Sequence, residues 1–72
     1  MKLVEIESLQ YKGTVEINAE DRRYPVDIFF DPETRAVIQV IRELGKWRRL
    51  EPGTVASQTY SADDWSDLET SD

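Results

Sequence analysis

The sequence contains no cysteine and no histidine. These absences exclude disulfide bonds and any zinc site built from Cys and His ligands. They also remove the commonest general base and the most reactive thiol nucleophile, so the composition argues against an enzyme. We therefore expect no catalytic residue, no bound metal and no cofactor. The lack of cysteine is consistent with a reducing compartment, and we expect a cytoplasmic protein.

Long apolar runs are missing as well. No segment approaches the roughly 20 apolar residues of a membrane-spanning helix. The first eight residues, MKLVEIES, alternate apolar with acidic side chains and lack the apolar stretch of a signal peptide. The three glycines are far apart, which excludes a glycine-rich phosphate loop. The sequence predicts a soluble protein with no membrane partner and no export signal.

Basic residues are absent from the last part of the chain. Residues 1–50 contain nine basic and nine acidic residues, whereas residues 51–72 contain six acidic residues and no basic one. The whole net charge of −6 therefore belongs to residues 51–72. A basic run, residues 46–49, closes the neutral part. Because unbalanced charge acts on partners at long range rather than on the fold, this asymmetry indicates a binding protein.

Alternation of apolar and polar residues marks three segments, residues 2–9, 14–18 and 24–30. A period of two with one apolar face predicts half-buried antiparallel strands. The connector Lys12-Gly13 is short and polar, as hairpin loops are. Pro25 has no backbone N–H, so we expect the third strand to be an edge strand or to be paired from one side there.

Residues 31–50 have two interpretations. As a helix, the segment begins with Asp31 as N-cap and Pro32 in the first turn, and Gly45 caps its end. Its apolar face would consist of Val37, Val40, Ile41, Leu44 and Trp47. As a strand, residues 31–34 would be a hairpin turn. Against the strand, Arg35 stands where such turns favour glycine, and alternation would place apolar residues on both faces. The helix is therefore the preferred interpretation.

These observations predict an α+β fold: a small antiparallel β-meander of three to four strands packed by one amphipathic helix. The alternative is an all-β meander or small barrel. Residues 1–60 would form a single small domain, and residues 61–72 an acidic C-terminal tail that is flexible or a short helix. A domain of this size buries only about 60% of its unfolded surface, so a homodimer is one way to gain stability. The expected core consists of Val4, Ile6, Val15, Ile17, Val26, Ile28, Phe30, Val37, Val40, Ile41, Leu44 and Trp47.

The acidic tail carries the predicted partner-binding residues. They are Asp63, Asp64, Trp65, Asp67, Leu68 and Glu69. Carboxylates steer the encounter with a basic surface, and a Trp–Leu pair supplies an apolar anchor. We predict a non-enzymatic protein-binding module, inhibitory or accessory, whose acidic surface docks on a basic partner such as a nucleic-acid-handling enzyme. Small acidic proteins with which phages or other mobile elements block host machinery fit this description.

The basic run supports an alternative function. A small β module could bind nucleic acid through these four residues, because arginine pairs with phosphate and tryptophan stacks on bases. They are Lys46, Trp47, Arg48 and Arg49. The net charge of −6 opposes a polyanionic ligand, so nucleic acid is the less expected partner.

Overall fold

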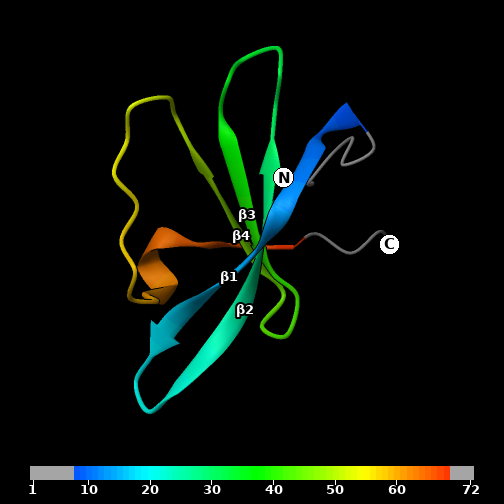
Figure 1. The fold of residues 1–72 in the computed structure, drawn as a ribbon. Coiled ribbons are helices and arrows are strands. Elements are labelled where there is room, and N and C mark those ends of the chain that lie inside the picture. The colour runs from blue at the N-terminus through cyan, green and yellow to red at the C-terminus, as the bar shows by residue number, and fades with distance from the viewer. Residues whose placement is uncertain (1–7, 69–72) are drawn as a thin grey trace.

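Five antiparallel strands form one sheet in which every strand lies beside its neighbour in the sequence. The structure is a computed structural model that describes residues 8–68. The strands are β1 (Gln10–Ala19), β2 (Arg22–Phe30), β3 (Val37–Ile41), β4 (Lys46–Leu50) and β5 (Ser66–Asp67), and a short 3-10 helix, η2 (Ala62–Asp64), precedes β5. Figure 1 shows the sheet nearly edge-on, with the yellow and orange segment, residues 51–65, on one side of it. The predicted first strand, with Val4 and Ile6, lies outside the described residues except for its last two.

The helix predicted after Asp31 does not form, so the α+β prediction is wrong and the all-β meander fits. The segment is a hairpin turn followed by β3. Its β-branched residues favour an extended chain, and both sides of the strand are covered: Ile38 and Val40 are buried on one face and Ile41 on the other. Apolar residues on both faces, which argued against a strand, therefore reflect burial of the sheet from both sides.

The features interpreted as helix caps belong to turns. The Asp31 carboxylate accepts a hydrogen bond from the Glu33 N–H at 2.9 Å, and this bond lowers the pKa of Asp31. The Asp31 carbonyl accepts from the Arg35 N–H at 2.7 Å. Gly45, with φ of +66°, lies in the turn between β3 and β4, where its N–H donates to the Arg42 carbonyl at 3.2 Å. Asx and glycine signals thus mark turns as readily as helix ends.

Arg35 adopts a left-handed backbone conformation, with φ of +66°. This conformation destabilises the folded state by roughly 1–2 kcal/mol when the residue is not glycine. Glycine avoids this cost, but its greater conformational entropy in the unfolded chain offsets part of the gain. Arg35→Gly should therefore raise the free energy of unfolding by about 0.5–1 kcal/mol, measured by urea denaturation. Glu33→Gly in the same turn is the control and should lower stability, because Glu33 has no positive φ to relieve. An Arg35→Gly variant less stable than the parent would contradict this account.

Lys12-Gly13 is not a hairpin loop, because β1 continues through it. Tyr11 pairs with Phe29 and Gly13 with Ile28, so Lys12 is one extra residue in a β-bulge. Gly13 has φ of +132°, which side chains disfavour.

The expectation for Pro25 is confirmed. β2 lies inside the sheet, but at Pro25 it is paired only with Glu16 of β1, because its pairing with β3 begins at Asp27. The absence of an N–H at Pro25 therefore removes no hydrogen bond between β2 and β3.

The sheet has a core on each face. The front-face core consists of Ile17, Val26, Ile41 and Trp65, with Tyr24, Ile28, Leu44 and Tyr60 partly buried against it. The back-face core consists of Phe29, Ile38, Val40 and Trp47, with Leu9 and Leu68 partly buried against it. The sequence interpretation had placed Val15 in the core, yet this residue is 51% exposed. Phe29 was not in the expected core, and it is buried on the back face within the chain.

Candidate functional site

The predicted anchors of the acidic tail pack into the sheet. Trp65 is only 6% exposed in the front-face core, and Leu68 packs against the back-face core. Between them β5 pairs with β4, and the Leu68 N–H donates to the Gly45 carbonyl at 2.8 Å. Residues 65–68 thus wrap around the edge of β4. Trp65 would have to leave the core to contact a partner.

The acids of the tail have separate environments. Asp63 and Asp64 are exposed on η2. Asp67 pairs with the Lys46 ammonium, and this hydrogen bond raises the pKa of Lys46. Glu69 lies outside the described residues. Of the predicted acidic contacts, Asp63 and Asp64 are therefore exposed and have no basic side chain within 4.0 Å in residues 8–68.

Ion pairs leave an excess of negative charge on the described surface. Residues 8–68 contain eleven acidic residues, and five of them lie within 4.0 Å of a basic side chain. Six acids therefore have no ion-pair partner in this part of the chain. They are Glu20, Asp21, Asp31, Glu33, Asp63 and Asp64. Four of the six belong to two segments, the β1–β2 turn and η2.

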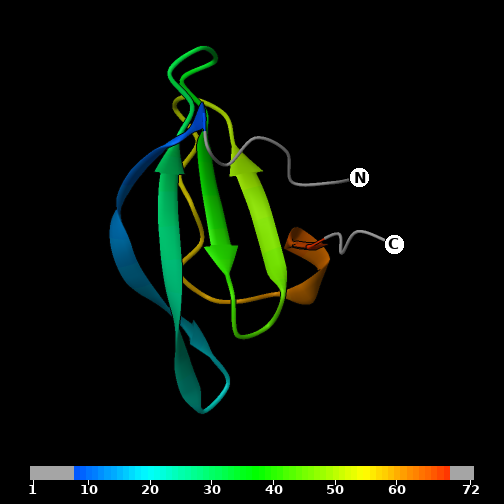
Figure 2. The ribbon, with the colours of Figure 1, turned by 90° about the vertical axis from the view of Figure 1, so that its right-hand side faces the viewer.

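These two segments border the same hollow, which has a volume of about 420 Å³. Glu20 and Asp21 line it from the β1–β2 turn, and Ala62 lines it from η2, immediately before Asp63 and Asp64. The remaining lining residues are Ala19, Arg22, Tyr24, Leu44 and Tyr60. We call this region, with the four acids, the acidic end. Figure 2 shows its β1–β2 turn at the end of the sheet opposite the turn between β2 and β3.

The side chain of Arg22 shows how a basic group binds at the acidic end. The Arg22 guanidinium carbon lies 4.6 Å from the centroid of the Tyr24 ring, and an Arg22 nitrogen lies 3.6 Å from the Glu43 carboxylate. A basic side chain thus has its charge on an aromatic face and beside an acid. Tyrosine faces and carboxylates attract a second basic side chain by the same forces.

The basic run of the alternative function is divided by β4. Neighbouring residues of a strand point to opposite faces, so Lys46 and Arg48 lie on the front face and Trp47 and Arg49 on the back face. Trp47 is 5% exposed and cannot stack on a base without leaving the core. Arg49 donates to Glu51 at 2.6 Å, which raises the pKa of Arg49. The four residues do not form one basic surface.

Arg48 is the buried member of this run, with 8% of its surface exposed. Its Nε donates to Gln39 Oε1 at 2.6 Å and its Nη2 to the Ser57 carbonyl at 2.8 Å. The guanidinium carbon lies 4.3 Å from the centroid of the Trp65 ring. Burial lowers the pKa of Arg48, and the charge of Asp64 acts in the opposite direction.

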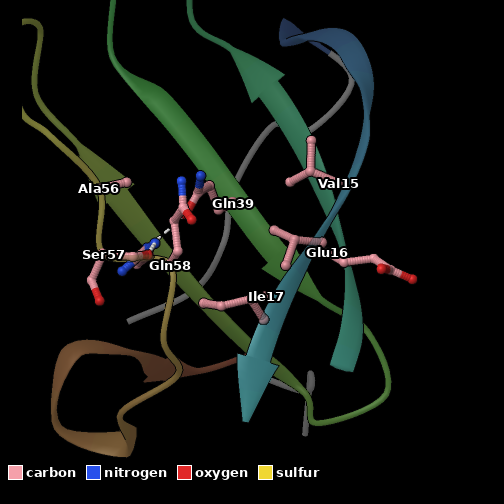
Figure 3. A pocket seen from close by; sticks show the side chains of 9 residues that line it. Val15, Glu16, Ile17, Gln39, Ala56, Ser57 and Gln58 are labelled. Carbon is pink, nitrogen blue, oxygen red and sulfur yellow. Dashed lines mark hydrogen bonds between the residues drawn. The ribbon is translucent and has the colours of Figure 1, made fainter. Parts of the chain in front are cut away.

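Arg48 lines a second concave site, a groove of about 330 Å³ between β1 and residues 56–58. Figure 3 shows the groove, with the side chain of Glu16 directed away from it. The apolar lining residues are Val15, Ile17, Val26 and Ala56, and the polar ones are Glu16, Gln39, Arg48, Ser57 and Gln58. An apolar lining with a few convergent polar groups is typical of binding sites. The sequence analysis missed this groove, because residues 15–17 and 56–58 are distant in the chain.

The described residues offer no arrangement for metal chemistry. Among residues 8–68, no three acidic side chains gather in a way that could hold a metal ion. No helix in this part of the chain is long and apolar enough to cross a membrane. Comparison with protein-family models, with curated proteins and with solved structures found no match.

Proposed function

We propose that this protein is a non-enzymatic protein-binding module whose acidic end docks on a basic surface of another protein. The observation that carries the proposal is one partly apolar hollow that Glu20 and Asp21 line and that η2, which carries Asp63 and Asp64, borders through Ala62. None of these four acids has an ion-pair partner within residues 8–68. Carboxylates at the rim accelerate encounter with a basic partner, and apolar contact at the centre slows its release.

The apolar anchor of the proposal differs from the one expected from the sequence. Tyr24, Leu44 and Tyr60 are partly buried and line the hollow, so they can contact a partner without leaving the core. Lysine and arginine side chains of a partner have an apolar methylene stem, which can pack on the tyrosine rings. Their charged ends can then lie beside the surrounding carboxylates.

A nucleic-acid-handling enzyme is the class of partner that we favour. Its cationic groove normally holds phosphates, and an array of carboxylates has the charge sign of that ligand. The proposed role is therefore accessory or inhibitory. Because the chain has no cysteine, we place this role in the reducing cytoplasm.

The combined change Asp63→Asn and Asp64→Asn should slow association with a basic partner by about tenfold, because rim charges mainly steer encounter. The probe is a decapeptide of alternating lysine and leucine, and the measurement is its association rate by surface plasmon resonance. In the parent protein, binding should weaken steeply from 0.1 M to 1 M salt, where the screening length falls from about 10 Å to about 3 Å.

Glu33→Gln with Glu51→Gln is the matched control. It removes the same charge at the opposite end of the sheet and should change the rate much less. Equal losses in both double variants would show that only net charge matters and would contradict docking at the acidic end.

A further inference from the structure

The buried guanidinium of Arg48 has no carboxylate within 4.0 Å among residues 8–68, and Asp64 acts on it only from a greater distance. Its hydrogen-bond acceptors, Gln39 Oε1 and the Ser57 carbonyl, are neutral. By contrast, five other basic residues of this part, Arg22, Arg23, Arg42, Lys46 and Arg49, each have a carboxylate within 4.0 Å. Burying a charge is costly unless an opposite charge compensates it. A ligand carboxylate in the adjoining groove would supply that compensation.

The guanidinium retains donors for such a ligand. Nε and Nη2 have acceptors within the described part of the chain, whereas Nη1 has none there. Nη2 also carries a second hydrogen beyond the one donated to Ser57. Arginine presents its N–H groups as a planar fork that matches a carboxylate. The apolar walls of the groove, with Val15 51% exposed at its border, would strengthen this contact by excluding water.

The free edge of β1 adds a second element of recognition. The Asn18 N–H donates to the Gln58 carbonyl at 3.0 Å, and the Tyr60 N–H donates to the Asn18 carbonyl at 2.7 Å. Asn18 therefore directs its backbone groups away from β2. Because backbone orientation in a strand repeats every two residues, the N–H and carbonyl groups of Glu16 also point away from β2.

Asn18 and Thr59 form an isolated parallel bridge, and this pairing does not continue to Glu16. No backbone bond joins Glu16 to residues 56–58 within the described chain, and the groove lies in that place. The edge of β1 at Glu16 is therefore open to an extended peptide, which could pair with it by β-augmentation.

We propose that the groove beside Arg48 binds an extended acidic segment of another protein. The main chain of this segment pairs with β1 at Glu16, and a glutamate or aspartate side chain bonds to the Arg48 guanidinium. This site is separate from the acidic end and takes a ligand of opposite charge, so it goes beyond the proposed function.

Two blocked pentapeptides, acetylated and amidated, test this inference. The probe Thr-Val-Glu-Val-Thr should bind at least about tenfold more tightly than Thr-Val-Gln-Val-Thr, since a hydrogen bond to a charged group is lost in the second. Amide NMR titration should show saturable shifts at Val15, Glu16 and Ser57. Equal affinity of the two peptides would overturn the proposal, and so would acetate binding as tightly as the glutamate peptide.

Variants of the protein locate the site. Val15→Glu places a carboxylate at the border of the groove and should weaken the glutamate peptide about tenfold by repulsion. Val55→Glu is the control, because Val55 is 93% exposed, does not line the groove and receives the same charge. Arg48→Met, checked for its fold by circular dichroism, should abolish the preference for glutamate over glutamine. Equal effects of the two glutamate substitutions, or a preference retained in Arg48→Met, would show the site to be elsewhere.

Discussion

Trp65→Ala should lower the free energy of unfolding by about 3–5 kcal/mol, the usual cost of truncating a buried tryptophan. Trp65 is 6% exposed and packs with Ile17, Val26 and Ile41, and its ring is covered by the Arg48 guanidinium at 4.3 Å. Small domains have a total stability of roughly 5–15 kcal/mol, so this substitution should leave little of it.

Urea denaturation followed by far-ultraviolet circular dichroism measures the effect. Val55→Ala is the control, since Val55 is 93% exposed and its truncation should change stability by less than about 0.5 kcal/mol. Deleting residues 61–72 should destabilise the protein at least as much as Trp65→Ala, because the deletion also removes β5. A Trp65→Ala variant with an unchanged midpoint would mean that the front-face core does not depend on the tail.

Phe29→Ala should also lower the free energy of unfolding, by about 3–5 kcal/mol. The same substitution at the neighbouring Phe30 provides the comparison. Phe29 is 5% exposed in the back-face core, where its ring centroid lies 5.6 Å from that of Tyr11. Phe30 has the same side chain on the opposite face but is only partly buried, with the Lys12 ammonium 5.6 Å from its ring. Phe30→Ala should therefore cost about half as much, in proportion to buried area.

The comparison of these two variants by urea denaturation determines whether the sheet is buried on both sides. If the back face were merely a surface, Phe29→Ala would be the milder change. A larger loss for Phe30→Ala than for Phe29→Ala would contradict the two-core arrangement.

Local pattern was sufficient for β2 and insufficient for β3. The alternation of residues 24–30 predicted a strand, and β2 spans it. In residues 37–41, apolar residues with little alternation fitted a helix face equally well. The deciding fact is that a second core covers the other side of the sheet, which depends on Phe29 and Trp47 of neighbouring strands. Likewise, Lys12-Gly13 has the composition of a turn, but pairing with β2 makes it a bulge.

The candidate sites show the same division. The sequence located the excess of acids, and Asp63 and Asp64 remain exposed in the fold. The sequence interpretation treated Trp65 as an anchor for a partner. Composition does not distinguish a tryptophan that binds another protein from one that packs in the core against Val26 and Ile41. The acids of the β1–β2 turn, Glu20 and Asp21, were not singled out, since only the folded chain brings them to the same hollow as η2.

The sequence by itself determined the charge asymmetry, the lack of Cys and His chemistry, and the strand of residues 24–30, because these depend on composition and on a repeat between near neighbours. The tertiary structure alone decided that β3 is a strand, that Trp65 is part of the core, and that Arg48 is buried beside a groove. Each of these depends on contacts between segments far apart in the chain. Burial results from such contacts. It makes Trp65 a core residue rather than an exposed anchor, and it makes Arg48 a buried cation with no carboxylate within 4.0 Å among residues 8–68.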